Sequence, residues 1–181
     1  MKPAFKILSQ IFLVFLFGIL GCESDTPNNP IKDLATKRST NQLQFLKPQK
    51  SGFNKAFKAE QYVTASDGGT VLLGDETSGY SSIDFMPGDL INNSVIIFEW
   101  DSQSFFAELN PHGIYFNNPV RLTLSYNEAD VSGVQEENLR IWYYDESQDD
   151  WELIGGQVDT EERQVEAYIG HFSKYALAEE D

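Results

Sequence analysis

The sequence Val120-Arg121-Leu122-Thr123-Leu124-Ser125-Tyr126 decides the fold class of this chain. Its apolar residues stand at every second position, from Val120 to Tyr126, and polar residues fill the positions between them. Successive side chains of a β-strand point to opposite faces, so the apolar residues share one face. We therefore predict a strand over residues 120–126 whose apolar face lies in the core.

Short segments of similar character lie on both sides of this strand. Turn-forming clusters rich in Gly, Pro, Asn and Asp separate them, as at Asp67-Gly68-Gly69 and Asn117-Asn118-Pro119. The predicted strands cover residues 61–66, 70–73, 82–85, 94–100, 113–116, 120–126, 139–144, 151–155, 164–169 and 172–178. Short strands at this spacing predict an all-β fold, an antiparallel β-sandwich formed by residues 61–181.

Residues 139–154 are predicted to form a β-hairpin with an acidic turn. Four carboxylates lie in or beside that turn, those of Asp145, Glu146, Asp149 and Asp150. Calcium prefers several oxygen ligands, so these residues are a candidate calcium site, the one cofactor that the sequence suggests. The turn lacks the central glycine of an EF-hand loop, and the alternative is an acidic tip that is simply solvated.

Residues 1–21 carry the pattern of a secretory signal peptide. Lys2 and Lys6 form a short basic region, and an apolar segment then runs to Leu20. The closing Ile19-Leu20-Gly21-Cys22 resembles the lipobox of bacterial lipoproteins. The resemblance implies cleavage before Cys22 and acylation of this cysteine, for example with palmitate. Membrane lipid would then be a partner of the acylated chain. We expect the protein to lie in the bacterial cell envelope, anchored at the outer membrane.

Two alternatives remain for this N-terminal segment. One is an ordinary signal peptide with an incidental cysteine, and the other is an uncleaved anchor. Acylation is favoured because Cys22 is the only cysteine of the chain. A single thiol in an oxidising compartment has no intramolecular disulfide partner.

Residues 22–60 are predicted to be the lipidated N-terminus followed by a flexible linker, because they show no sustained period. Leu43, Phe45, Phe53 and Phe57 suggest an alternative, in which the second half of this segment lies on the domain or on a lipid surface.

The net charge differs between this N-terminal segment and the rest of the chain. Residues 23–58 carry a net charge of +4, whereas residues 59–181 hold four basic residues against 25 acids, a net charge of −21. A body of that sign disfavours nucleic acid as a partner, and the basic stalk suits an anionic lipid surface.

Residues 67–178 resemble the ZU-five domain, which occurs in zonula occludens proteins, netrin receptors of the uncoordinated-five type and ankyrins. The segments that carry the resemblance are Gly68-Gly69-Thr70-Val71, Met86-Pro87-Gly88-Asp89-Leu90, Pro111-His112-Gly113-Ile114-Tyr115-Phe116, Trp142-Tyr143-Tyr144-Asp145-Glu146 with Trp151, and His171-Phe172-Ser173-Lys174-Tyr175-Ala176. The resemblance implies a β-sandwich that binds other proteins. The partner would be an envelope or extracellular protein that the sequence does not identify.

The resemblance also suggests self-cleavage at His171-Phe172-Ser173. Some ZU-five-type domains of death-domain proteins cut themselves before a Ser or Thr that follows an apolar residue and a histidine. Here the Ser173 hydroxyl would attack the Phe172 carbonyl while His171 takes the proton. The alternative is that Phe172 is a core residue of the last strand and that its two neighbours face water.

No other enzymatic pattern is found in the sequence. It contains no Gly-x-Ser-x-Gly elbow, no phosphate loop and no zinc-type His/Cys cluster. His112 stands between a proline and a glycine and is predicted to be a turn residue. We therefore expect a binding or structural module rather than an enzyme. A third hypothesis is a carbohydrate-binding module, in which Trp142, Tyr144 and Trp151 form a stacking platform.

Overall fold

The structure, a computed structural model, describes residues 43–49, 57–101 and 103–180. The predicted signal peptide, Cys22 and most of the predicted linker lie outside these residues. Within the described ranges, no helix combines the length and the apolar character needed to cross a membrane.

The described chain consists mostly of β-strands joined by tight turns. In chain order the elements are β1 (Leu43–Phe45), β2 (Lys47–Pro48), β3 (Lys58–Val63), β4 (Gly69–Asp75), β5 (Gly79–Phe85), β6 (Ser94–Asp101), β7 (Phe106–Asn110), β8 (Tyr115–Ser125), β9 (Ala129–Asp130), the short 3₁₀ helix η2 (Glu136–Asn138), β10 (Arg140–Asp145), β11 (Asp150–Gly155), β12 (Gln157–Asp159), β13 (Gln164–His171) and β14 (Lys174–Glu180).

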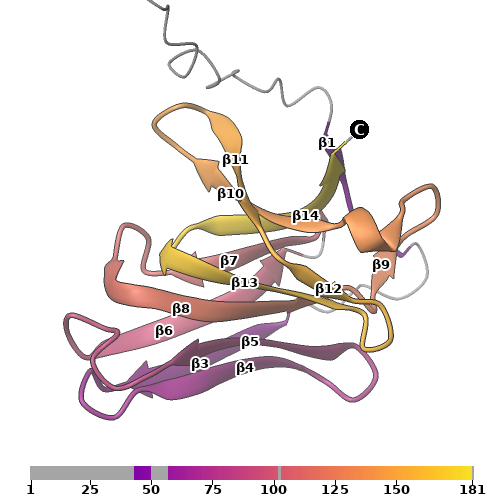
Figure 1. The fold of residues 1–181 in the computed structure, drawn as a ribbon. Helices are drawn as coiled ribbons and strands as arrows, with labels where there is room; N and C mark the ends of the chain where they lie inside the picture. Colours follow the sequence, from indigo (N-terminus) through magenta and orange to yellow (C-terminus); the bar gives the residue numbers. More distant parts are fainter. Residues whose placement is uncertain (1–42, 50–56, 102, 181) are drawn as a thin grey trace, which may run out of the picture. The chain divides into compact units, whose positions relative to one another are not determined.

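The strands form two antiparallel sheets that pack face to face (Figure 1). One sheet has the order β11-β10-β14-β7-β6-β3, with β1 pairing the end of β14, and the other has the order β12-β13-β8-β5-β4. Strands β2 and β9 make a separate small pair. The predicted all-β sandwich is thus confirmed.

The core lies between the two sheets, and strand β8 supplies its centre. Val120, Leu122, Leu124 and Tyr126 are each at most 1 % exposed, as the alternation predicts. The opposing sheet contributes a similar set of buried side chains, among them Ile96, Phe98, Leu109, Tyr175 and Leu177.

The predicted linker is wrong for its described second half. Residues 43–49 form β1 and β2, and β3 begins at Lys58 rather than at residue 61. Leu46 is 2 % exposed, and its amide donates a hydrogen bond to the carbonyl of Leu177. The alternative, in which this apolar stretch lies on the domain, therefore holds for Leu43–Phe45 and Leu46. Phe57 is half-buried against the core, whereas Phe53 lies outside the described residues.

Two predicted strands, 113–116 and 120–126, merge into the single strand β8. The turn expected at Asn117-Asn118-Pro119 lies within that strand. Proline is tolerated there because the ladder with β13 shifts register between Val120 and Tyr115, and β5 pairs only farther along β8. Strands β7 and β12, both short, were not predicted.

Candidate functional site

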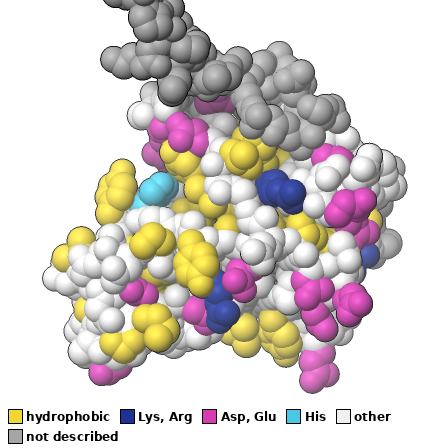
Figure 2. Space-filling view, in the orientation of Figure 1, with side chains coloured by type: hydrophobic (Ala, Val, Ile, Leu, Met, Phe, Trp, Pro, Cys, Tyr) yellow, Lys and Arg dark blue, Asp and Glu magenta, His cyan; other side chains and the backbone are white. Residues whose placement is uncertain are grey.

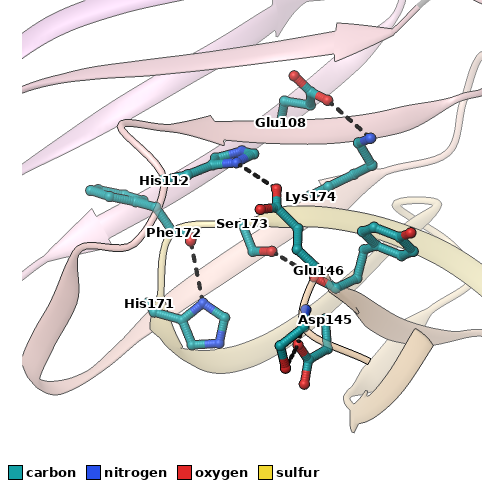
Figure 3. A network of polar contacts seen from close by, with 10 residues as sticks. Glu108, His112, Asp145, Glu146, His171, Phe172, Ser173 and Lys174 are labelled. Carbon is teal, nitrogen blue, oxygen red and sulfur yellow. Dashed lines mark hydrogen bonds and ion pairs between the residues drawn. The ribbon is translucent and has the colours of Figure 1, made fainter. Parts of the chain in front are cut away.

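An open cleft of about 320 Å³ lies where the β10–β11 hairpin approaches the β7–β8 and β13–β14 connections. It brings together both histidines of the chain, three tyrosines and the start of the acidic turn (Figure 3). Its lining residues are His112, Gly113, Tyr115, Tyr143, Tyr144, Asp145, Glu146, Ser147, His171, Phe172 and Ser173.

Phe172 fixes the floor of this cleft. Its side chain is 1 % exposed and meets the rings of Phe85 and Phe116 edge-on, with centroids 6.0 and 4.8 Å away. The Phe172 amide donates to the Ile114 carbonyl at 3.0 Å, and the Leu109 amide donates to the Ser173 carbonyl at 3.0 Å. The β13–β14 connection is thereby held to β7 and β8, which confirms the alternative in which Phe172 is a core residue.

His171 lies half-buried among aromatic rings. Its ring centroid is 5.3 Å from that of Tyr115 and 5.0 Å from that of Tyr143. Its Nδ1 lies 3.3 Å from the carbonyl oxygen of Phe172, and its own carbonyl accepts a 2.5 Å hydrogen bond from the Tyr175 hydroxyl. The imidazole is therefore placed to polarise the Phe172 carbonyl when Nδ1 carries a proton.

Ser173 is 8 % exposed, so its side chain does not face water as the alternative expected. Its hydroxyl donates a hydrogen bond to the Tyr144 carbonyl at 3.0 Å (Figure 3). Tyr144 belongs to β10, so this bond ties the hairpin to the β13–β14 connection. The hydroxyl proton points at a backbone carbonyl and not at His171.

A contact between His112 and Glu146 closes one side of the cleft. Nδ1 of His112 lies 3.3 Å from Oε1 of Glu146, whose side chain is 72 % exposed (Figure 3). The sequence predicts His112 as a turn residue, and nothing in it indicates a partner 34 positions away. The contact joins the β7–β8 loop to the tip of the β10–β11 hairpin. It forms because the fold brings these two distant segments together.

The remaining carboxylates of the acidic turn each have a separate partner. Hydrogen bonds from Gln148 and Ser147 lower the pKa of Asp145 to about 2. Asp149 accepts a hydrogen bond from the Tyr144 hydroxyl, which raises the pKa of that tyrosine. Asp150 accepts a hydrogen bond from the Trp151 amide.

These four predicted calcium ligands thus do not converge. Across residues 43–49, 57–101 and 103–180, no three His, Cys, Asp or Glu side chains are arranged to hold a metal ion. The calcium site stays a prediction without support from this geometry.

Lys174 lies at the border of the cleft, where its ammonium group contacts both a carboxylate and an aromatic ring. Its Nζ is 3.4 Å from Oε1 of Glu108 and 5.6 Å from the ring centroid of Tyr144. A carboxylate and an aromatic face therefore share one ammonium group.

Of the three aromatic residues of the predicted stacking platform, Trp142 is buried, whereas Tyr144 and Trp151 are partly exposed. Trp142 is 2 % exposed and lies inside the protein, at a register shift between β10 and β11. Trp151 packs against Phe45 and Phe106, with ring centroids 5.0 Å away in both cases. Phe45 comes from β1, so the segment expected to be linker contacts this ring.

Comparison with known proteins adds no further assignment, because no family model and no curated protein matches the chain. The resemblance to the ZU-five domain therefore rests on the sequence segments alone. The structure places Gly68-Gly69 at the turn between β3 and β4, and His171-Phe172-Ser173 at the junction of β13 and β14.

Proposed function

We propose that this chain is a lipid-anchored binding module of the bacterial cell envelope, with a ZU-five-like sandwich that binds another protein through the cleft at His171. Membrane attachment follows from acylation of Cys22, which the lipobox-like sequence supports. The sandwich is then the part that meets the partner.

The observation that carries the binding proposal is the presence of an exposed carboxylate and tyrosine rings in one cleft. Glu146 is largely exposed at its edge, and Tyr115 is 66 % exposed beside it. A lysine or arginine of a partner would gain both a charge contact and an aromatic face, as Lys174 does at Tyr144. The net charge of −21 over residues 59–181 would also steer a basic partner toward this domain.

The test is crosslinking in intact cells followed by pull-down of the full chain. Glu146→Lys reverses the charge at the cleft, and we expect it to remove the specific crosslinked partner. Glu76→Lys, on the exposed β4–β5 turn, makes the same charge change elsewhere and is expected to leave the crosslink intact. Cys22→Ser should release the protein from the membrane and end labelling by palmitate.

Two results would contradict the proposal. A crosslink equally strong in Glu146→Lys and the unchanged protein would remove the cleft as the binding surface. Unlabelled Cys22 and a chain that washes free in buffer would remove the envelope anchor.

The second candidate function is self-cleavage between Phe172 and Ser173. The contact between His171 Nδ1 and the Phe172 carbonyl favours it, because a donor there stabilises the oxyanion that forms during attack. Ser173 Oγ would add to the carbonyl carbon, its proton would pass to His171, the base that the motif predicts, and the Phe172–Ser173 C–N bond would break as the nitrogen is protonated. Water would then hydrolyse the ester. The Ser173 hydroxyl must first give up its bond to Tyr144.

Intact-mass measurement tests this step. If cleavage occurs, residues 173–181 form a separate peptide that includes β14, which pairs with β10, β7 and β1. We therefore expect the peptide to stay bound in native buffer and to separate only in denaturant, and Ser173→Ala to abolish the break. A single uncut mass under both conditions would rule out cleavage.

A further inference from the structure

A second and larger cleft, of about 740 Å³, lies on the outer face of the β12-β13-β8-β5-β4 sheet. It is lined by Tyr80, Ser82, Arg121, Thr123, Gln157, Val158, Asp159, Thr160, Glu161, Gln164 and Glu166. A volume of this size is within the range of small-ligand sites. The His171 cleft shares none of these residues.

Strand register places these side chains in rows across the sheet. Ser82 is opposite Thr123, which is opposite Glu166, and Glu166 is opposite Gln157. These polar side chains therefore lie about 5 Å apart on neighbouring strands. Such a row matches a ligand that presents polar groups repeatedly along its length.

A fixed ion-pair network forms one side of the cleft. Arg121 donates to Oδ2 of Asp84 from Nε at 3.1 Å and from Nη2 at 3.0 Å, and its Nη1 is 3.7 Å from Glu166. Thr70 and Ser82 donate to the same Asp84 carboxylate at 2.5 and 3.3 Å. The guanidinium is thus held in one orientation before any ligand arrives.

Hydroxyl and amide side chains are prominent among the residues that line the cleft. Among the described residues, the side chains of Thr123, Gln157 and Gln164 have no hydrogen-bond partner. Each of them can both donate and accept. A ligand rich in hydroxyl groups, which also donate and accept, satisfies such side chains better than a carboxylate, a phosphate or an aliphatic chain does.

Two tyrosines supply the apolar contacts that a sugar ring also needs. Tyr80 is 45 % exposed in the cleft, and Tyr168 is 64 % exposed in the adjacent row, opposite Arg121. On the face turned to the reader in Figure 2, the lower of two basic groups lies between acidic side chains, with hydrophobic-class side chains, which include tyrosine, nearby. Rings of this kind present a flat apolar surface beside polar groups.

The charge of the cleft further restricts the class of ligand that can bind. Asp159, Glu161 and Glu166 line it against the single positive charge of Arg121, and Asp84 lies beside it. An anionic polysaccharide would be repelled. Arg121 is paired with two of the acids, and Asp159 accepts from the amides of Glu161 and Glu162, so these charges are largely engaged within the protein.

We propose that this sheet face binds a neutral oligosaccharide, with Arg121, Thr123 and Gln164 bonding its hydroxyl groups and Tyr80 stacking on a sugar ring. The site is separate from the cluster of Phe45, Phe106 and Trp151. It does not depend on the His171 cleft or on the lipid anchor.

Isothermal titration calorimetry of the full chain tests the proposal, with cellohexaose, chitohexaose and mannohexaose as probes. We expect at least one of the three to bind. Tyr80→Ala and Arg121→Met should each weaken that binding about tenfold or more, which corresponds to about 1.4 kcal/mol. Tyr62→Ala is the matched control, because Tyr62 is a 59 % exposed tyrosine on β3 of the other sheet.

The control separates the sheet face from general surface adhesion. Thr123→Val removes one hydroxyl at nearly constant volume, so it tests the hydrogen bond in a variant that keeps the fold, as its melting temperature would verify. If none of the three hexasaccharides binds at millimolar concentration, the proposal is wrong. It is equally wrong if Tyr62→Ala weakens binding as much as Tyr80→Ala, or if Tyr80→Ala, Arg121→Met and Thr123→Val all bind like the unchanged chain.

Discussion

Replacing Phe172 by alanine tests whether this residue anchors the floor of the His171 cleft. The side chain is 1 % exposed, and burying a phenylalanine contributes about 1.5–3 kcal/mol. The edge-on contacts with Phe85 and Phe116 add about 0.5–1.5 kcal/mol each. We therefore expect Phe172→Ala to lower the free energy of unfolding by about 3–5 kcal/mol, the range typical of buried phenylalanines.

Urea unfolding of the full chain, followed by tryptophan fluorescence, measures this loss. The transition midpoint should fall while its slope stays the same. Tyr168→Ala is the control, since it removes an aromatic side chain that is 64 % exposed on the preceding strand, and should change stability by less than about 0.5 kcal/mol. Phe172→Leu keeps most of the buried surface and should cost less than the alanine. A loss below about 1 kcal/mol for Phe172→Ala would refute the assignment of Phe172 as a core anchor.

Three further predictions concern the turns. Hydrogen bonds lower the pKa of Asp145 to about 2, so the ionised carboxylate stabilises the fold at pH values above the ordinary pKa of aspartate, and this stabilisation is lost as the pH falls toward 2. Asp145→Asn should therefore flatten the curve of stability against pH between about pH 4 and pH 2. An unchanged acid-unfolding curve would contradict this prediction. Calcium and a chelator should leave the melting temperature unchanged, because the hairpin carboxylates do not converge, and a rise with calcium would show otherwise. Gly68 has φ +70°, and a Cβ there would lie 2.2 Å from the Phe85 carbonyl oxygen, so Gly68→Ala should destabilise more than Gly88→Ala, at φ +89° with nothing within 4 Å, when both are compared by thermal unfolding.

The fold class follows from the sequence because alternation is a local property of each strand. Val120 to Tyr126 shows it, and the hairpin of β10 and β11 was likewise predicted within a few residues of its observed bounds. Strands β1 and β2 escaped prediction because they are two or three residues long and are stabilised by pairing with β14 and β9. A strand of two or three residues is too short to show the alternation of apolar and polar residues by which longer strands are predicted.

The candidate site was predictable in part. His171, Phe172 and Ser173 are adjacent in the chain, so a motif can find them. The contacts that define their chemistry are not local, since Ser173 bonds to Tyr144 and His112 pairs with Glu146. The cleft on the outer face of the second sheet combines residues of β5, β8, β12 and β13, and the register that aligns them is visible only in the fold.

The position of β14 has a consequence for how the protein is made. This last strand lies in the middle of its sheet, so without it β11 and β10 have no hydrogen-bonded link to β7, β6 and β3. A nascent chain therefore cannot complete this sheet until β14 has left the ribosome.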